Sequence, residues 1–133
     1  MKQPSIITHL VIHHSASKPS TTPEEILKWH LDRGFSTWGY HKIITEEGLV
    51  HNCRPENVVP ASVQGYNKGT LAVCLTGNFE TDKPNEFQKI SLMLVIKEWL
   101  AQHPGAKVVG HKDLGATLCP GKNLYSFIKE IWP

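Results

Sequence analysis

The stretch IITHLVIHH, residues 6–14, is rich in β-branched side chains and lies between Pro4 and the turn-forming sequence SASKP at residues 15–19. This composition, bounded in this way, predicts a buried β-strand that leads into a loop. Its last two residues, His13 and His14, both carry imidazoles. Because consecutive side chains of a strand point to opposite faces, periodicity alone does not decide which of the two histidines faces a common site.

The residues that follow this strand predict alternating helices and strands. The sequence TPEE at residues 22–25 combines an N-cap, a proline at the first helical position and an acidic residue at the third, which is typical of a helix start. In chain order we predict a strand at 6–14, a helix from 23 that ends at Gly34, hairpin arms at 40–45 and 49–53, a strand at 71–76, a helix at 85–103, a strand at 107–110 and a helix at 124–132. The order β-α-β-β-β-α-β-α predicts an α/β fold, a single domain over residues 1–133 with a central mixed β-sheet flanked by about three helices.

The composition narrows the possible partners and location. A chain of 133 residues with 40% hydrophobic and 20% charged residues suits one domain with a continuous core. The formal charge is only +2 and the basic residues are scattered, so no nucleic-acid partner is expected. No signal peptide is visible, and no apolar stretch reaches the roughly 18 residues that span a bilayer. We therefore expect a monomer that is made in the cytoplasm and has no membrane partner.

Three residues form a candidate metal site: His13, His111 and Cys119. Two imidazoles and one thiolate are a ligand set for Zn²⁺ that leaves the fourth tetrahedral position free for water, as in catalytic zinc sites. A loop that contains glycine and proline, residues 115–121, can fold back to bring Cys119 near His111. The ordinary alternative is that a histidine at a strand end is a hydrogen-bonded surface residue, and spacing alone does not exclude it.

Five groups of motifs follow one another in a recognisable order. They are VIHHSA at 11–16, WGYH at 38–41, GYN at 65–67, VCLTGNF at 73–79, and GHKD at 110–113 with CPG at 119–121. With these motifs the chain resembles the zinc-dependent N-acetylmuramoyl-L-alanine amidases over nearly its whole length. It looks most like the small phage lysozyme-amidases, whose fold is shared with animal peptidoglycan-recognition proteins.

The resemblance implies a metal site and its working partners. The family's zinc ligands fall on His13, His111 and Cys119, so that each chain would bind one Zn²⁺. Tyr40 and Thr117 fall on positions that assist the chemistry, by donating hydrogen bonds to a developing oxyanion or by orienting water.

Further positions are implied to bind substrate in the groove around the metal. They are Trp38, Ser62 and Asn67. Ser62 departs from the pattern, because relatives commonly carry a histidine at the matching position. This departure concerns how the groove grips a stem peptide and does not affect the metal ligands.

The implied reaction is hydrolysis of the amide bond between N-acetylmuramic acid and the L-alanine of the peptidoglycan stem peptide. The protein would then act on the cell wall after release, as the endolysin of a phage or prophage does. The alternative is a peptidoglycan-binding module that has the same fold without turnover. Binding-only members typically lose the cysteine ligand, whereas Cys119 is present here, and the sequence therefore favours an enzyme.

Overall fold

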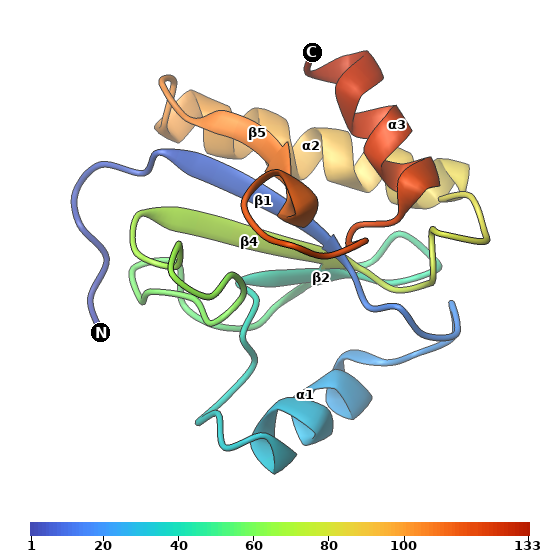
Figure 1. The fold of residues 1–133 in the computed structure, drawn as a ribbon, viewed down its shortest axis with the longest axis horizontal. Helices are drawn as coiled ribbons and strands as arrows, with labels where there is room; N and C mark the ends of the chain where they lie inside the picture. The colour runs from blue at the N-terminus through green and yellow to red at the C-terminus, as the bar shows by residue number, and fades with distance from the viewer.

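Four parallel strands form most of the sheet in the computed structural model, which describes residues 1–133 (Figure 1). A fifth strand pairs antiparallel with its neighbour at one edge. The strands are β1 (His9–His14), β2 (Lys42–Ile44), β3 (Val50–Asn52), β4 (Thr70–Leu75) and β5 (Lys107–Gly110). Their order across the sheet is β3-β2-β4-β1-β5, so β1 lies between β4 and β5. The predicted mixed sheet is confirmed.

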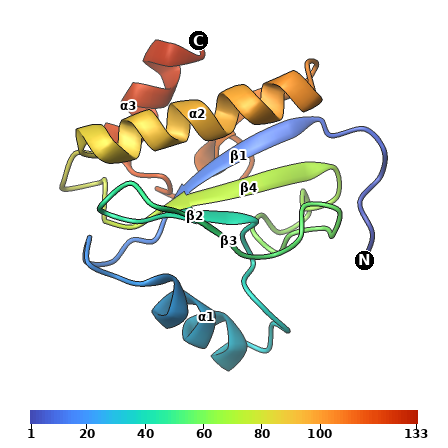
Figure 2. The same cartoon turned by 180° about the vertical axis from the view of Figure 1, so that it is seen from behind.

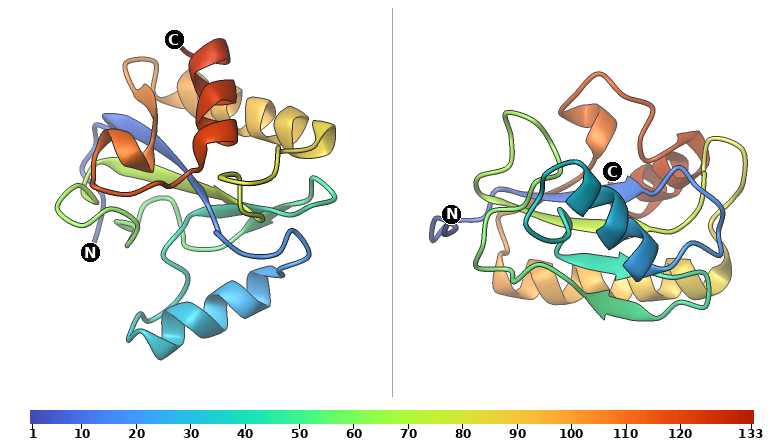
Figure 3. Two further views of the ribbon diagram at one scale, coloured as in Figure 1. Left: turned by 45° about the vertical axis from the view of Figure 1, so that its right-hand side comes forward. Right: turned by 90° about the horizontal axis from the view of Figure 1, so that it is seen from below.

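Helices cover both faces of this sheet. They are α1 (Pro23–Asp32), α2 (Glu86–Gln102) and α3 (Lys122–Ile131), and a short 3-10 helix, η1 (His111–Asp113), follows β5. α2 and α3 lie over one face and α1 lies over the other, as the front and back views show (Figure 1, Figure 2). The view from below places α1 across the strands (Figure 3). None of the three helices is both long and apolar enough to cross a lipid bilayer.

The main core fills the space between the sheet and the helices α2 and α3. Leu10 and Ile12 of β1 belong to this core, together with the fully buried Leu92 and Ile96 of α2. A smaller cluster of Ile26, Ile43 and Cys74 packs on the opposite side, which α1 covers. Because side chains alternate along a strand, the residue after Ile12 faces the α1 side. That residue is His13, and only 1% of its surface is exposed.

The N-cap predicted at the start of α1 is present in the structure. The Thr22 side chain accepts a hydrogen bond from the Glu25 backbone, and the Glu25 side chain accepts one from the Thr22 backbone, which completes a capping box. The helix ends at Asp32, two residues before Gly34. Gly34 has a φ of +93°, a conformation that glycine adopts without a steric penalty just after a helix.

Several predicted boundaries shift in the structure. β1 begins at His9 and not at Ile6, because pairing with β4 starts at His9 opposite Thr70, and Ile6 is exposed. The two hairpin arms shorten to residues 42–44 and 50–52. η1 was not predicted, since three residues are too few for a periodic pattern.

The helix α2 is apolar around most of its circumference, so its sequence did not indicate which stripe is buried. Leu92 is fully buried against the sheet, whereas Leu94, two residues later, is 62% exposed. Phe87 and Ile90 are also exposed. Contact with the sheet, which is a tertiary property, selects the buried side.

Leu92→Ala and Leu94→Ala provide a matched pair that tests this packing. Loss of the buried Leu92 side chain should lower the free energy of unfolding by about 2–5 kcal/mol, because a cavity remains. Leu94→Ala should change it by less than about 0.5 kcal/mol, as an exposed position does. Urea unfolding of both variants measures the difference, and equal losses would contradict the observed orientation of α2.

Candidate metal centre

The site lies where the parallel strands β1 and β5 end side by side. Ile12 of β1 is in register with Gly110 of β5, so the chain continues from both strands at the same edge of the sheet. His13 is the next residue of β1, and His111 directly follows β5. The carboxyl ends of parallel strands form the usual binding crevice of open α/β sheets. The pairing of β1 with β5 therefore brings the two imidazoles together.

The loop after β5 folds back and carries Cys119 to the same place. The Lys112 backbone N–H donates a hydrogen bond of 2.8 Å to the Cys119 carbonyl oxygen, which closes the loop. Gly110 permits this close approach, because a Cβ at that position would lie only 2.8 Å from the Pro120 side chain. The sequence at the end of β5 therefore allows Pro120, and with it Cys119, to pack against the strand.

The three side chains converge on one point. Their ligand atoms all lie within 4.8 Å of one another, and the His13 and His111 rings are 4.8 Å apart between centroids. The Cys119 Sγ lies 3.6 Å from Nδ1 of His13. Zinc bonds of about 2.3 Å to sulfur and about 2.0–2.1 Å to nitrogen, at a tetrahedral angle, separate two such atoms by about 3.6 Å. The observed distance therefore fits a shared tetrahedral ion.

Neither ring nitrogen of His13 forms a hydrogen bond with an oxygen or nitrogen atom of the protein. Nδ1 faces the Cys119 sulfur, and Nε2 is buried without a hydrogen-bond partner. Buried polar atoms of native proteins are nearly always paired. Nε2 lies on the opposite side of the ring from Nδ1, so the ligand that this site can hold is indicated by Nδ1, whose neighbour is the Cys119 sulfur.

Burial sets the protonation of the three groups. It lowers the pKa of His13 well below the usual value, helped by the nearby His111, and it also lowers the pKa of His111. Both imidazoles are therefore neutral at pH 7, which is the form that binds metals. Burial raises the pKa of Cys119 to about 12, and the N–H of His14, 3.4 Å from Sγ, partly offsets this. A cation that displaces the thiol proton relieves the penalty for a buried thiolate.

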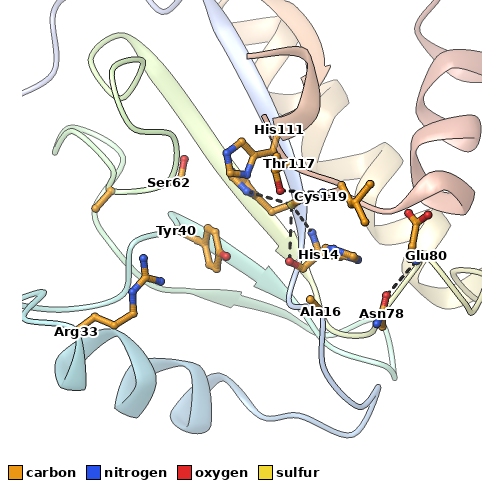
Figure 4. A pocket seen from close by; sticks show the side chains of 13 residues that line it. His14, Ala16, Arg33, Tyr40, Ser62, Asn78, Glu80, His111, Thr117 and Cys119 are labelled. Atoms are coloured by element: carbon orange, nitrogen blue, oxygen red, sulfur yellow. Dashed lines mark hydrogen bonds between the residues drawn. The ribbon is translucent and has the colours of Figure 1, made fainter. Parts of the chain in front are cut away.

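The geometry separates the two adjacent histidines that the strand pattern left open. The Nδ1 of His14 accepts a hydrogen bond of 3.1 Å from the Phe79 backbone N–H, and its ring lies near the Phe79 ring. In Figure 4 the His14 ring points away from His111. His13 is therefore the histidine that joins His111 and Cys119, while His14 contributes its backbone N–H to the sulfur.

Two hydroxyl groups predicted to assist the chemistry lie beside the three ligands. The Tyr40 ring centroid is 5.0 Å from that of His13, and burial raises the pKa of Tyr40 well above its usual value. The Thr117 hydroxyl oxygen accepts a hydrogen bond of 3.2 Å from the Cys119 backbone N–H. Both hydroxyls are protonated at neutral pH and are available as hydrogen-bond donors.

These groups surround a cavity of about 510 Å³, within the roughly 300–1,000 Å³ range of small-molecule sites. Figure 4 shows the cavity with the labelled side chains from its several elements. Its lining residues are His13, His14, Ala16, Arg33, Tyr40, Ala61, Ser62, Asn78, Glu80, His111, Thr117, Leu118 and Cys119. The three candidate ligands, Tyr40, Thr117 and Ser62 are thus brought together.

Trp38 and Asn67 lie outside this cavity and support its wall. The Trp38 indole N–H donates a hydrogen bond of 2.7 Å to the Pro23 carbonyl, which ties the segment after α1 to its start. The Asn67 side-chain oxygen accepts hydrogen bonds from the backbone N–H groups of Ser62 and Val63, both of 2.8 Å. Asn67 therefore shapes the loop that presents Ser62, and direct contact of either residue with substrate stays a prediction.

The sequence reasoning did not single out three charged residues near the site. Arg33 and Glu80 line the cavity, and their positions at a helix end and in a turn carry no local signal. Asp113 belongs to the GHKD motif, which was the available signal. Its carboxylate accepts hydrogen bonds from the Gly110 N–H at 2.9 Å and from the Tyr125 hydroxyl at 2.6 Å. Asp113 thereby fixes the turn that carries His111.

A family model described as N-acetylmuramoyl-L-alanine amidase matches residues 2–122. The chain belongs to this amidase family. It is 33% identical over 133 residues to the endolysin of Escherichia phage T7, an alignment that covers 92% of this chain and 86% of that protein. The resemblance stated from the motifs is therefore confirmed.

Solved structures of amidase and recognition proteins share the fold. The N-acetylmuramoyl-L-alanine amidase LysC from Clostridium intestinale is 29% identical, with a TM-score of 0.87, over 96% of this chain and 86% of that one. The tracheal cytotoxin complex of the peptidoglycan recognition proteins LCa and LCx matches with 30% identity and a TM-score of 0.91. That match covers 100% of this chain and 86% of that one. The fold is thus shared by a protein described as an amidase and by proteins described as peptidoglycan recognition proteins.

Asp113→Ala tests whether this carboxylate positions His111. Partial burial opposes the charge of Asp113, but hydrogen bonds from Tyr125 and Gly110 and the nearby Lys129 outweigh it and lower the pKa. The contact is therefore complete at neutral pH and is lost only as the pH falls through the lowered value. We expect Asp113→Ala to weaken Zn²⁺ binding about tenfold, as loss of outer-shell support does.

Competition with a chromophoric chelator measures this affinity at pH 7. Tyr125→Phe is the matched control, because it removes one hydrogen bond and leaves the Gly110 contact in place. Its effect should be smaller. Unchanged zinc affinity in Asp113→Ala would show that the turn holds His111 without the carboxylate.

Proposed function

We propose that the protein is a zinc-dependent amidase that cleaves the bond between N-acetylmuramic acid and the L-alanine of the stem peptide. The observation that carries this proposal is the convergence of His13, His111 and Cys119 in the wall of a substrate-sized cavity. Membership of the amidase family and similarity to a phage endolysin support it. By the same similarity we propose an endolysin role, with the cell wall as the site of action.

The chemistry divides between the metal and the protein. When bound, zinc supplies Lewis-acid activation of water and of the amide carbonyl. His13 and His111 are held neutral by burial, so they offer lone pairs without first losing a proton. Cys119 adds a negative charge that the His14 N–H stabilises. The three residues therefore fit zinc in donor type, the imidazoles are already in the metal-binding form, and Cys119 would lose its proton on binding the ion.

Tyr40 and Thr117 are proposed to stabilise charge that develops on the substrate. The raised pKa of Tyr40 keeps its phenol protonated at neutral pH, so it donates a hydrogen bond and does not act as a base. The Thr117 oxygen already accepts from the Cys119 N–H, which leaves its own proton free to donate. Donors fixed before the reaction lower the barrier, because they need no reorganisation as the oxyanion forms.

The alternative is a peptidoglycan-binding module without turnover. Similarity to recognition proteins makes this class relevant. The complete ligand set argues for an enzyme, since a binding groove needs neither a buried thiol nor two neutral imidazoles beside it. Measurements on the ligands themselves separate the two functions.

Cys119→Ser and His13→Ala should each abolish hydrolysis of peptidoglycan while the fold is kept. Each change removes one of the three candidate metal ligands at the sheet edge. Neither residue belongs to the main hydrophobic core, so the fold should be kept. Clearing of a peptidoglycan suspension measures activity, and circular dichroism checks the fold. Cys53→Ser is the matched control, since this thiol lies outside the cavity, and it should retain full activity. Full activity in a folded ligand variant would refute the site assignment.

Removal of the metal should stop the reaction reversibly. After treatment with a chelator, the protein should clear no peptidoglycan, and addition of one equivalent of Zn²⁺ should restore activity. The products should carry new alanine amino termini, detected by amine labelling and mass spectrometry. Clearing that is indifferent to the chelator, or zinc binding without release of alanine amino termini, would eliminate the amidase proposal.

A further inference from the structure

The cavity carries one permanent positive charge and one carboxylate, on opposite sides of the candidate metal ligands. The positive charge is Arg33, at the end of α1, and the carboxylate is Glu80, after β4. Figure 4 shows Arg33 on the side of Tyr40 and Glu80 beyond His14 and Asn78. A substrate that lies across the ligands therefore meets charges of opposite sign at its two ends.

The Arg33 guanidinium has no ion-pair partner in the protein. It lies 5.0 Å from the centroid of the Phe35 ring, which supports it from one side. Arg54, the other arginine of the chain, is different, because its guanidinium donates to the carbonyls of Trp38 and Val59. Arg54 thus holds the fold, while the donors of Arg33 remain free.

A second hollow continues the cavity past Arg33. Arg33, Ser62, His111 and Thr117 line both spaces, and the second extends to Gln64. Arg33 therefore stands at the junction, where an extended ligand that leaves the metal ligands passes into the second hollow. Glu80 lines only the first space.

We propose that Arg33 binds the free α-carboxylate of the second stem residue, D-isoglutamate, and makes the enzyme specific for stems in which that carboxylate is not amidated. This inference rests on the proposed amidase function and names the part of the substrate that the site selects. A planar guanidinium is suited to bidentate pairing with a carboxylate. The Glu80 carboxylate accepts a hydrogen bond of 2.8 Å from the Lys122 N–H at the start of α3 and disfavours a second carboxylate on its side. In this proposal the peptide therefore extends toward Arg33 and the uncharged glycan toward Asn78.

The length of a stem peptide places its first free carboxylate close to the scissile bond. Consecutive Cα atoms are about 3.8 Å apart, so the second-residue carboxylate stands roughly 6 Å from the scissile nitrogen. Tyr40 lies between Arg33 and His111 in Figure 4, and the Tyr40 and His13 ring centroids are 5.0 Å apart. A carboxylate that extends past Tyr40 therefore lies on the Arg33 side of the cavity.

Two synthetic muramyl peptides test the inference. They are identical except that the second residue carries either a free α-carboxylate or a carboxamide. The zinc-loaded protein should show a kcat/KM about tenfold higher for the carboxylate, the low end for a charge-assisted hydrogen bond at an exposed side chain. Arg33→Gln should remove this preference by losing activity on the carboxylate substrate alone, and Arg33→Lys should retain part of it.

Lys97→Gln is the matched control, because it removes one positive charge on α2, outside both hollows. It should keep the full preference. Equal activity of the unmodified protein on both peptides would overturn the inference, as would an equal loss on both in Arg33→Gln.

Calorimetric titration of the metal-free protein with the same peptides separates this inference from the proposed function. Tighter binding of the carboxylate peptide, abolished in Arg33→Gln, supports the Arg33 contact even if neither peptide is hydrolysed, an outcome that would refute the amidase proposal alone. Equal binding of the two peptides, together with hydrolysis of both at equal rates, would leave the amidase intact and refute the role of Arg33.

Discussion

Parallel pairing of β1 with β5 is the constraint on which the site depends. The two strands are distant in sequence, yet their register places Ile12 beside Gly110. The residue after each of these is a histidine, so one ladder of backbone hydrogen bonds fixes the relative position of both imidazoles. The loop that returns to Cys119 then needs only a short closure, held by the Lys112 N–H. A rigid sheet edge thus supplies the precision that a site built on loops would lack.

The two faces of the sheet have different roles. The α2 and α3 side holds the large apolar core, and the α1 side holds a small cluster beside the cavity. On the α1 side, Nδ1 of His30 accepts a hydrogen bond of 2.8 Å from the Gly39 N–H. Burial, helped by the two nearby arginines, lowers the pKa of His30 to about 4, so it stays a neutral acceptor near pH 7. This contact fixes the turn from which Tyr40 approaches His13, and burial on this side serves positioning as well as stability.

The sequence predicted those features that local chemistry determines. The capping box at Thr22, the strand at residues 107–110 and the element order were all readable, because each depends on neighbours in the chain. The buried side of α2 was not, since only contact with the sheet distinguishes Leu92 from Leu94. The choice between His13 and His14 likewise came from motifs and not from periodicity.

The groove was the least predictable part of the site. Asn67 belongs to a recognisable motif, but its side chain is occupied by the backbone of the loop that carries Ser62. Arg33 has no motif, and its importance comes from what it lacks, an ion-pair partner inside the protein. Specificity depends on the three-dimensional surroundings of single side chains, which a linear pattern does not encode.

The central claim is that His13, His111 and Cys119 together hold one zinc ion. X-ray absorption at the zinc edge tests it most directly on the zinc-loaded protein. The account predicts one sulfur at about 2.3 Å and nitrogen or oxygen neighbours at about 2.0–2.1 Å, with the outer-ring scattering of two imidazoles. A spectrum without a sulfur neighbour, or with imidazole scattering from only one histidine, would contradict it.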